Sequence, residues 1–134
     1  MTHLDFFNET LNKMTGITPG TYAAFVSQDG LVLHSNVDDE FVEKQLGSFA
    51  SEFLDHGKKI FSIPLSAKNG QTRDVQTAIT VGSDRVFVIT PFLADAFLVI
   101  VSPDKARINE FLKKSLEEVD RLQKLIQSKE IHFS

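Results

Sequence analysis

The most apolar part of the chain is the stretch 86–103, in which hydrophobic residues occupy nearly every position rather than every second or third one. Pro91 and Asp95 lie near its middle, where a membrane-spanning helix would lose a backbone hydrogen bond and bury a charge. Val, Ile and Phe predominate, and these residues favour strands. The pattern therefore predicts a hairpin of two strands, 86–90 and 96–102, each buried on both faces at the centre of a sheet.

The rest of the chain alternates between helical and strand-like patterns. Apolar residues at helical spacing predict helices over about 4–15, 39–56 and 104–128. Short strand-like runs predict a hairpin over 21–35, closed by a tight Asp-Gly turn, and a strand over 74–81. Strands that are apolar on both faces need helices on both sides. We therefore predict one α+β domain spanning 1–134, a three-layer α/β/α sandwich around a five-stranded antiparallel sheet.

The helix predicted over 39–56 is apolar over an unusually wide arc. A helix that covers a sheet needs only the centre of such an arc, so the flanks indicate a second partner, unless the connector 57–73 covers them. The predicted centre consists of Val42, Leu46, Phe49 and Phe53, and the flanks of Gly47, Ala50 and Leu54 on one side and Phe41 on the other.

Composition and charge exclude several classes of function. The 134 residues are 42% hydrophobic and 24% charged, as in ordinary globular proteins. With 14 basic and 18 acidic residues, a net charge of −4 and no basic cluster, we expect no nucleic-acid binding. The absence of cysteine excludes disulfides and thiolate metal sites. No secretory signal is recognisable at the N-terminus, so we expect a cytoplasmic protein without membrane insertion.

Catalytic chemistry finds little support in the sequence. No phosphate-binding loop occurs, and the four histidines lack the spacing of a metal site. Ser27, Asp29 and His34 lie close together in sequence, but Asp29 falls in a predicted turn and Ser27 lies across a hairpin from His34. We therefore expect no catalytic residue, no metal and no cofactor, and we predict that the chain is not an enzyme.

Three stretches, in this order along the chain, are similar to those of a known family. They are the first hairpin "FVSQDGLVLHS", the last hairpin "RVFVITPFLADAFLVIVSP" and the entry into the final helix, "SPDKARI". Over about residues 4–128 the sequence resembles the roadblock/dynein light chain family. The resemblance implies a roadblock/profilin-like sheet of order 2-1-5-4-3. It also implies a dimer in which the third strands pair edge to edge and the second helices lie side by side.

The same resemblance implies regulation or scaffolding of a small Ras-like GTPase. One alternative is an adaptor subunit of a motor or signalling complex without GTPase contact. Another is a small-molecule sensor domain, which the Phe-rich interior disfavours because a ligand pocket needs convergent polar groups. The last turns of the final helix must overhang the sheet, where its apolar residues are covered either by the first helix or by a partner.

Two sets of residues are candidates for these contacts. The strand at 74–81 has a polar face and contains neither Pro nor Lys to block pairing, so we expect homodimerisation there and along the neighbouring helix. The predicted dimer interface comprises Gly47, Ala50, Ser51, Leu54, Asp74, Gln76, Ala78 and Thr80. The predicted partner-binding residues on the outer face of the helix are Phe41, Gln45, Ser48 and Glu52.

Overall fold

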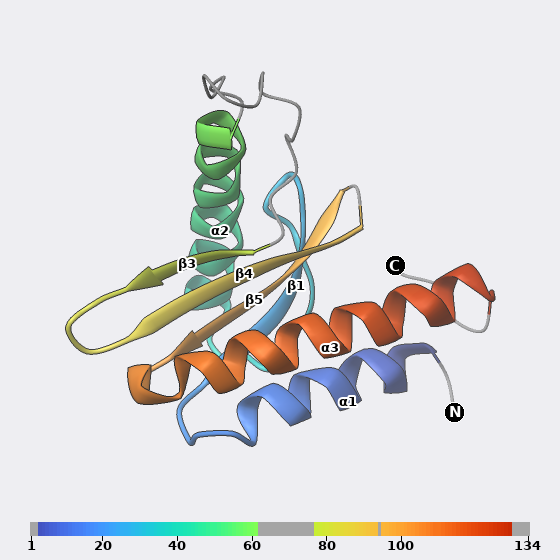
Figure 1. Ribbon diagram of the computed structural model, residues 1–134, viewed down its shortest axis with the longest axis horizontal. Coiled ribbons are helices and arrows are strands. Elements are labelled where there is room, and N and C mark those ends of the chain that lie inside the picture. The colour runs from blue at the N-terminus through green and yellow to red at the C-terminus, as the bar shows by residue number, and fades with distance from the viewer. Residues whose placement is uncertain (1–2, 62–76, 94, 130–134) are drawn as a thin grey trace, which may run out of the picture.

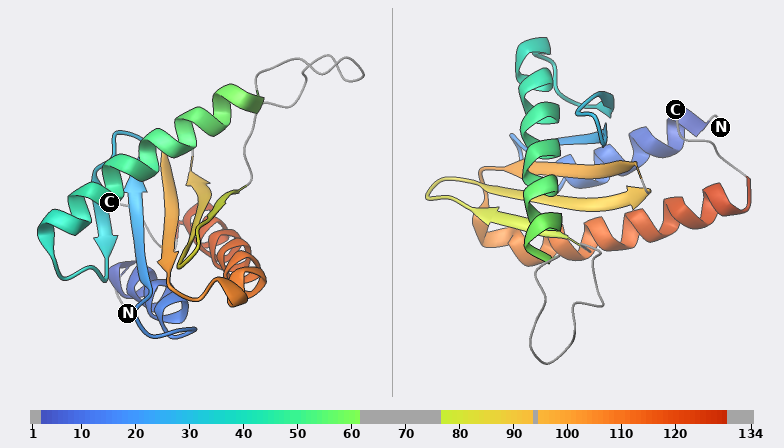
Figure 2. Two further views of the ribbon diagram at one scale, coloured as in Figure 1. Left: turned by 90° about the vertical axis from the view of Figure 1, so that its left-hand side faces the viewer. Right: turned by 90° about the horizontal axis from the view of Figure 1, so that it is seen from above.

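A single antiparallel sheet separates two helical layers in the computed structural model, which describes residues 3–61, 77–93 and 95–129 (Figures 1 and 2). The strand order is β2-β1-β5-β4-β3, which confirms the predicted order 2-1-5-4-3. The elements are α1 His3–Thr15, β1 Tyr22–Ser27, β2 Val32–Ser35, α2 Glu40–Phe61, β3 Ala78–Val81, β4 Val86–Leu93, β5 Ala96–Ser102, the 3-10 turn η1 Lys105–Arg107 and α3 Ile108–Gln127.

The two strands predicted to be central, β4 and β5, do lie in the interior of the sheet. Val88 pairs with Ile100 and Ile89 with Val99, and all four side chains are fully buried. Strand β4 continues past the predicted end at residue 90, because a bulge after Pro91 accommodates a residue that has no backbone N–H to donate.

Each face of the sheet carries its own apolar core. Alternate side chains of one strand point to opposite faces, so β1, β4 and β5 supply both cores. Helices α1 and α3 cover one core, whose large members are Phe7, Phe25, Phe92, Leu98, Ile100, Phe111 and Leu122. Helix α2 covers the other, made of Ala24, Val26, Ala50, Leu54, Ile89, Phe97 and Val99. The predicted three-layer arrangement is therefore confirmed, with α1 and α3 on one side and α2 on the other (Figure 2).

Some predicted boundaries need correction. Helix α2 does not end near residue 56 but continues to Phe61, and the last helix begins at Ile108 after a 3-10 turn rather than at 104. Of the predicted strand 74–81, residues 74–76 lie outside the described residues, and β3 begins at Ala78.

The C-terminal turns of α3 are covered by the first helix, which settles the two alternatives left open by the sequence. Leu122 is fully buried, while Leu125, Ile126 and Phe6 of α1 are partly buried against the same core. A polar contact also joins the two helices. The carboxylate of Glu118 accepts hydrogen bonds from Thr10 Oγ1 at 2.8 Å, Arg121 at 2.9 Å and Lys13 at 3.2 Å.

Candidate functional site

Helix α2 crosses the strands of the sheet steeply (Figure 2). It presents three of the predicted interface residues to its own subunit. Ala50 is 0% and Leu54 4% exposed, both within the α2-side core. Gly47 lies against the β1–β2 turn, where a Cβ atom would come within 2.3 Å of the Gly30 carbonyl oxygen. These three residues were predicted to contact a second copy. All three residues instead pack within their own subunit. The rotation of α2 about its axis turns this flank of the helix, rather than Phe49, towards the sheet and the β1–β2 turn.

Ser51, the fourth predicted helix residue of the interface, is also bound within the subunit. Its hydroxyl donates a hydrogen bond to the carbonyl oxygen of Gln28 at 2.5 Å, and this bond ties α2 to the end of β1. The turn contact and this bond together fix the rotation of the helix about its axis. This side of α2 is therefore engaged within the subunit.

The outer face of α2 carries the four predicted partner-binding residues. Their spacing of i, i+4, i+7 and i+11 places them along one side of a helix. All four residues are exposed, and Phe41 is 69% exposed. The four residues of this outer face are Phe41, Gln45, Ser48 and Glu52.

A second exposed apolar row runs along α2 between this outer face and the sheet, and we call it the α2 stripe. Phe49 is 58% and Ile60 65% exposed, whereas Val42 and Phe53 are half-buried. The ring of Phe53 meets Phe87 of β4 edge to face at 5.7 Å, so the stripe adjoins the α2-side core of the sheet. The hydrophobic period located an apolar arc but not its rotation, which is why Phe49 was predicted to be buried.

Strand β3 lies at the edge of the described sheet, on the side of the C-terminal half of α2 (Figure 2). Its register with β4 puts Ala78 beside Ile89 and Thr80 beside Phe87, so both side chains point to the α2 side. Ala78 is half-buried and Thr80 is exposed. Asp74 and Gln76, the other two predicted strand residues of the interface, lie outside the described residues.

The residues considered for catalysis have structural contacts. The ring of His34 stacks on Phe7 with 4.9 Å between centroids and an angle of 9° between the planes. Ser27 Oγ accepts a hydrogen bond from the backbone N–H of Leu31 at 3.2 Å, inside the hairpin turn that also holds Asp29. Within residues 3–61, 77–93 and 95–129, no group of three or more His, Asp or Glu side chains could hold a metal ion. In the same ranges no helix is both long and apolar enough to cross a bilayer.

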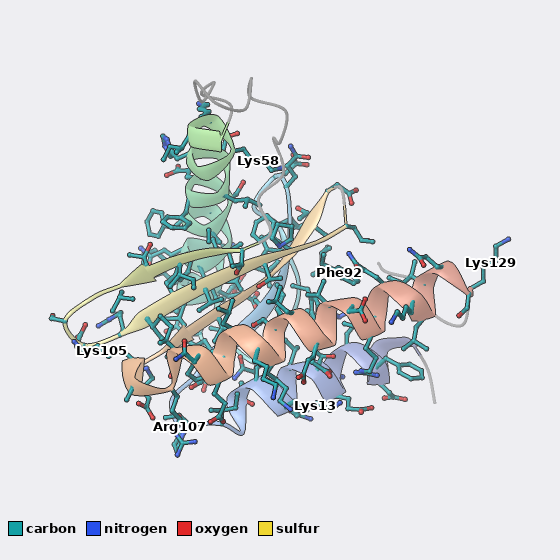
Figure 3. The ribbon with its side chains drawn as sticks, viewed as in Figure 1. Lys13, Lys58, Phe92, Lys105, Arg107 and Lys129 are labelled. Atoms are coloured by element: carbon teal, nitrogen blue, oxygen red, sulfur yellow. The ribbon has the colours of Figure 1, made fainter. Side chains whose placement is uncertain are left out.

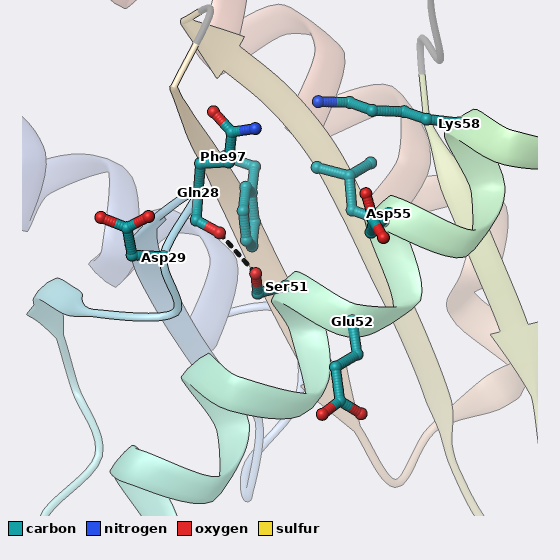
Figure 4. A pocket seen from close by; sticks show the side chains of 8 residues that line it. Gln28, Asp29, Ser51, Glu52, Asp55, Lys58 and Phe97 are labelled. Atoms are coloured by element: carbon teal, nitrogen blue, oxygen red, sulfur yellow. Dashed lines mark hydrogen bonds between the residues drawn. The ribbon is translucent and has the colours of Figure 1, made fainter.

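A surface pocket of about 290 Å³ lies between α2 and the ends of β1 and β5 (Figure 4). Phe97 and Leu54 supply its apolar floor, and the amino group of Lys58 reaches across it towards Gln28. Asp29, Glu52 and Asp55 also border the pocket, so both signs of charge are present. Its volume is at the lower limit for small-molecule sites, and its polar groups do not converge on one ligand chemistry. The pocket therefore gives no support to the sensor alternative.

No protein-family model and no curated protein matches the sequence, but solved structures match the fold closely. A Roadblock/LC7 domain from Streptomyces avermitilis superimposes with a TM-score of 0.73 at 16% identity, covering 89% of this chain and 96% of that one. The gliding protein MglB from Thermus thermophilus gives 0.71 at 14% identity, with 92% and 93% coverage. Myxococcus xanthus MglB gives 0.68 at 15% identity, with 93% and 90% coverage. In agreement with the resemblance of its sequence, the chain has the roadblock/LC7 fold.

Proposed function

We propose that the chain is a non-enzymatic homodimer that regulates or scaffolds a small Ras-like GTPase. The proposal rests on the roadblock/LC7 fold together with the sequence resemblance to that family. The structural observation that carries it is the α2 stripe, an apolar row exposed beside β3, the edge strand of the described sheet. Exposed apolar surface that borders an open strand edge is typical of an interface with another protein.

Strand β3 is suited to pair with its counterpart in a second copy. An edge strand offers unpaired backbone N–H and C=O groups, and proteins that avoid such pairing place Pro, Lys or a bulge there. The segment Ala78–Val81 contains none of these residues, and its register with β4 is regular. Antiparallel pairing of two β3 strands about a two-fold axis would extend the sheet from one subunit into the next.

The α2 stripe suits an antiparallel contact between two copies of the helix. If Phe49 lies at the two-fold axis, the exposed Phe49 side chains of the two copies meet each other there. The half-buried Phe53, one turn further along the stripe, lies beside this contact. The interface proposed from the sequence is retained in β3, but its helical part moves from Gly47, Ala50 and Leu54 to the α2 stripe.

The outer face of α2 remains accessible in such a dimer. The outer faces of the two copies would lie next to each other, and we propose that the GTPase binds there, with Phe41 as an apolar anchor and Glu52 as a charged contact. The GTPase would supply its own phosphate-binding loop, since the sequence of this chain contains none.

Two measurements test the proposal. Sedimentation analysis at micromolar concentration reports the mass, and we expect a dimer. The immobilised chain is then incubated with native lysate containing GDP or a non-hydrolysable GTP analogue, and captured proteins are identified by mass spectrometry. We expect the chain to capture a P-loop GTPase in a nucleotide-dependent manner, and the purified GTPase to bind the chain with the same dependence. A dimer that binds no GTPase in either nucleotide state would contradict the proposal and favour the adaptor alternative.

A further inference from the structure

A second exposed apolar surface lies on the side of the sheet away from α2. Ile79 and Val81 of β3 are 36% and 56% exposed, and Leu116 of α3 is 42% exposed. Leu112, one turn before Leu116, is half-buried. We call these four residues the β3–α3 patch.

The register of the strands makes the patch continuous. Ile79 pairs with Val88 and Val81 with Val86, and both valines belong to the core beneath α3. Because paired strands lie roughly 4.8 Å apart, the two β3 side chains stand next to that core, at its open edge. Ile79 and Val81 therefore extend the core beneath α3 to a part of the sheet that α3 does not cover.

The orientation of α3 turns Leu112 and Leu116 towards this edge. One flank of the helix faces α1, where Glu118 meets Thr10. The opposite flank faces β4, because the side chain of Gln123 donates a hydrogen bond to the carbonyl oxygen of Phe92 at 2.6 Å. Leu112 and Leu116 lie on the same flank as Gln123, because Leu116 follows Leu112 by four residues and Gln123 follows Leu116 by seven.

Two lysines border the patch without a carboxylate partner among the described residues. The amino group of Lys105 lies 3.5 Å from the carbonyl oxygen of Gly82, directly after Val81 (Figure 3). Lys113 follows Leu112 and is exposed. The acidic residues nearby are paired with other cations: Asp84 with Arg85, Asp104 and Glu110 both with Arg107, Glu117 with Lys114, and Asp120 with Lys124. The charge left over around the patch is therefore positive, in a chain whose net charge is −4.

From this combination we propose that the β3–α3 patch binds an acidic amphipathic helix of a partner protein. The apolar face of that helix packs on the four patch residues, and its carboxylates lie against Lys105 and Lys113. A helix suits the surface because Leu112 and Leu116 form a row parallel to α3, the kind of surface on which a helix lays its apolar face. A membrane suits it less, because lipid surfaces are recognised by clusters of roughly four to eight basic residues. The site lies on the face of the sheet opposite α2 and does not depend on the proposed GTPase contact. Pairing of two β3 strands through their backbone edges would leave its side chains on this face and bring the patches of the two copies together.

A phage-displayed library of amphipathic helices tests this inference. Each member carries Leu or Phe on one face and a random choice of Glu, Asp, Lys, Arg or Gln on the other. Selection against the full chain should enrich sequences with a net negative charge. Peptides made from them should bind about tenfold more weakly to Lys113→Glu and to Leu116→Glu, the change expected when one central contact is lost. Lys113→Glu alters an exposed side chain only, so it remains informative if Leu116→Glu impairs folding.

Two variants on the other side of the sheet are matched controls. Lys44→Glu makes the same charge change at an exposed position of α2, and Phe41→Glu replaces an exposed apolar side chain. Peptide affinity should be the same for both as for the unmodified chain. Failure to enrich any helix, enrichment of neutral or basic helices, or equal losses in the controls would overturn the inference. Binding to phosphatidylcholine–phosphatidylserine vesicles that Lys113→Glu abolishes would assign the patch to a membrane surface and overturn it as well.

Discussion

Gly47 of α2 lies directly against Gly30 of the β1–β2 turn, and Gly47 has no room for a side chain. A Cβ atom on Gly47 would approach the Gly30 carbonyl oxygen to 2.3 Å and Val32 Cγ2 to 2.9 Å. Gly30 itself has φ +88°, a left-handed conformation that favours glycine. This contact between two glycines fixes which side of α2 faces the sheet, and it thereby determines which residues remain on the outside.

Gly47→Ala should destabilise the protein although alanine is the better helix former. Alanine gains about 1 kcal/mol in helix propensity, but its methyl group would push the turn away from the helix. Forcing a methyl group into a closely packed site costs about 1–3 kcal/mol. We expect a lower free energy of unfolding in urea titrations, because backbone atoms of the turn cannot move aside as a side chain could. Ser48→Ala, at the adjacent exposed position, should change stability by less than about 0.5 kcal/mol. If Gly47→Ala is the more stable variant, the close contact between α2 and the turn is wrong.

Glu118 should make the stability of the α1–α3 pair depend on pH. Burial raises the pKa of this carboxyl group. Hydrogen bonds from Arg121, Thr10 and Lys13, together with the charge of Arg121, lower the pKa by more than burial raises it. The pKa therefore lies below its ordinary value of 4.5. A carboxyl group whose pKa is lower in the folded than in the unfolded state stabilises the protein at pH values above its unfolded-state pKa. That contribution is lost as the pH falls through the folded pKa.

Glu118→Gln should therefore lower the free energy of unfolding by about 1–3 kcal/mol at neutral pH, the range for hydrogen bonds to charged groups. As the pH falls below the ordinary value of 4.5, the difference from the unmodified chain should shrink. The carboxyl group of the unfolded chain is protonated first, and the native group follows as the pH passes its lower pKa. Urea titrations at a series of pH values measure this difference. Glu117→Gln removes only an exposed pair and should have little effect at any pH. A Glu118→Gln difference that stays constant down to pH 3 would contradict the assignment.

Sequence reasoning predicted the sheet well because its signals are local. The runs in β4 and β5 are apolar at successive positions, which only a strand covered on both faces tolerates. The rotation of α2 depends instead on a contact between Gly30 and Gly47, and no periodicity within the helix encodes such a long-range contact. The outward spacing of Phe41 and Glu52 was recognisable from the sequence. The exposure of Phe49 required the structure.

Ala50→Glu and Phe49→Glu should therefore have opposite consequences although the two residues are adjacent. Ala50 is 0% exposed in the core between α2 and the sheet, so a carboxylate there would be buried without a partner. The expected cost of about 4 kcal/mol or more should unfold much of the protein, as circular dichroism would show. Phe49 is 58% exposed, so Phe49→Glu should leave the subunit folded.

The same Phe49→Glu variant tests the proposed dimer. Two carboxylates would face each other across the two-fold axis, where an apolar contact is lost and like charges repel. We expect a folded monomer in sedimentation experiments under conditions in which the unmodified chain is a dimer. Lys124→Glu, a charge change on the exposed surface of α3, serves as the control and should remain dimeric. A Phe49→Glu protein that stays dimeric at micromolar concentration would exclude the α2 stripe as the interface.

Glu52→Arg should separate partner binding from dimerisation. Glu52 is exposed on the outer face of α2 and has no ion pair among the described residues, so reversing its charge breaks no internal contact. Stability and mass should therefore be unchanged. Affinity for the captured GTPase should fall by about three- to tenfold, mainly through slower association, since charges at the margin of an interface steer the encounter. Surface plasmon resonance at two salt concentrations measures the affinity. The difference in affinity between Glu52→Arg and the unmodified chain should be smaller at high salt. Glu117→Arg makes the same change on α3, across the sheet, and should bind like the unmodified chain. Equal affinities of Glu52→Arg and Glu117→Arg would remove the outer face of α2 from the GTPase contact while leaving the proposed dimer intact.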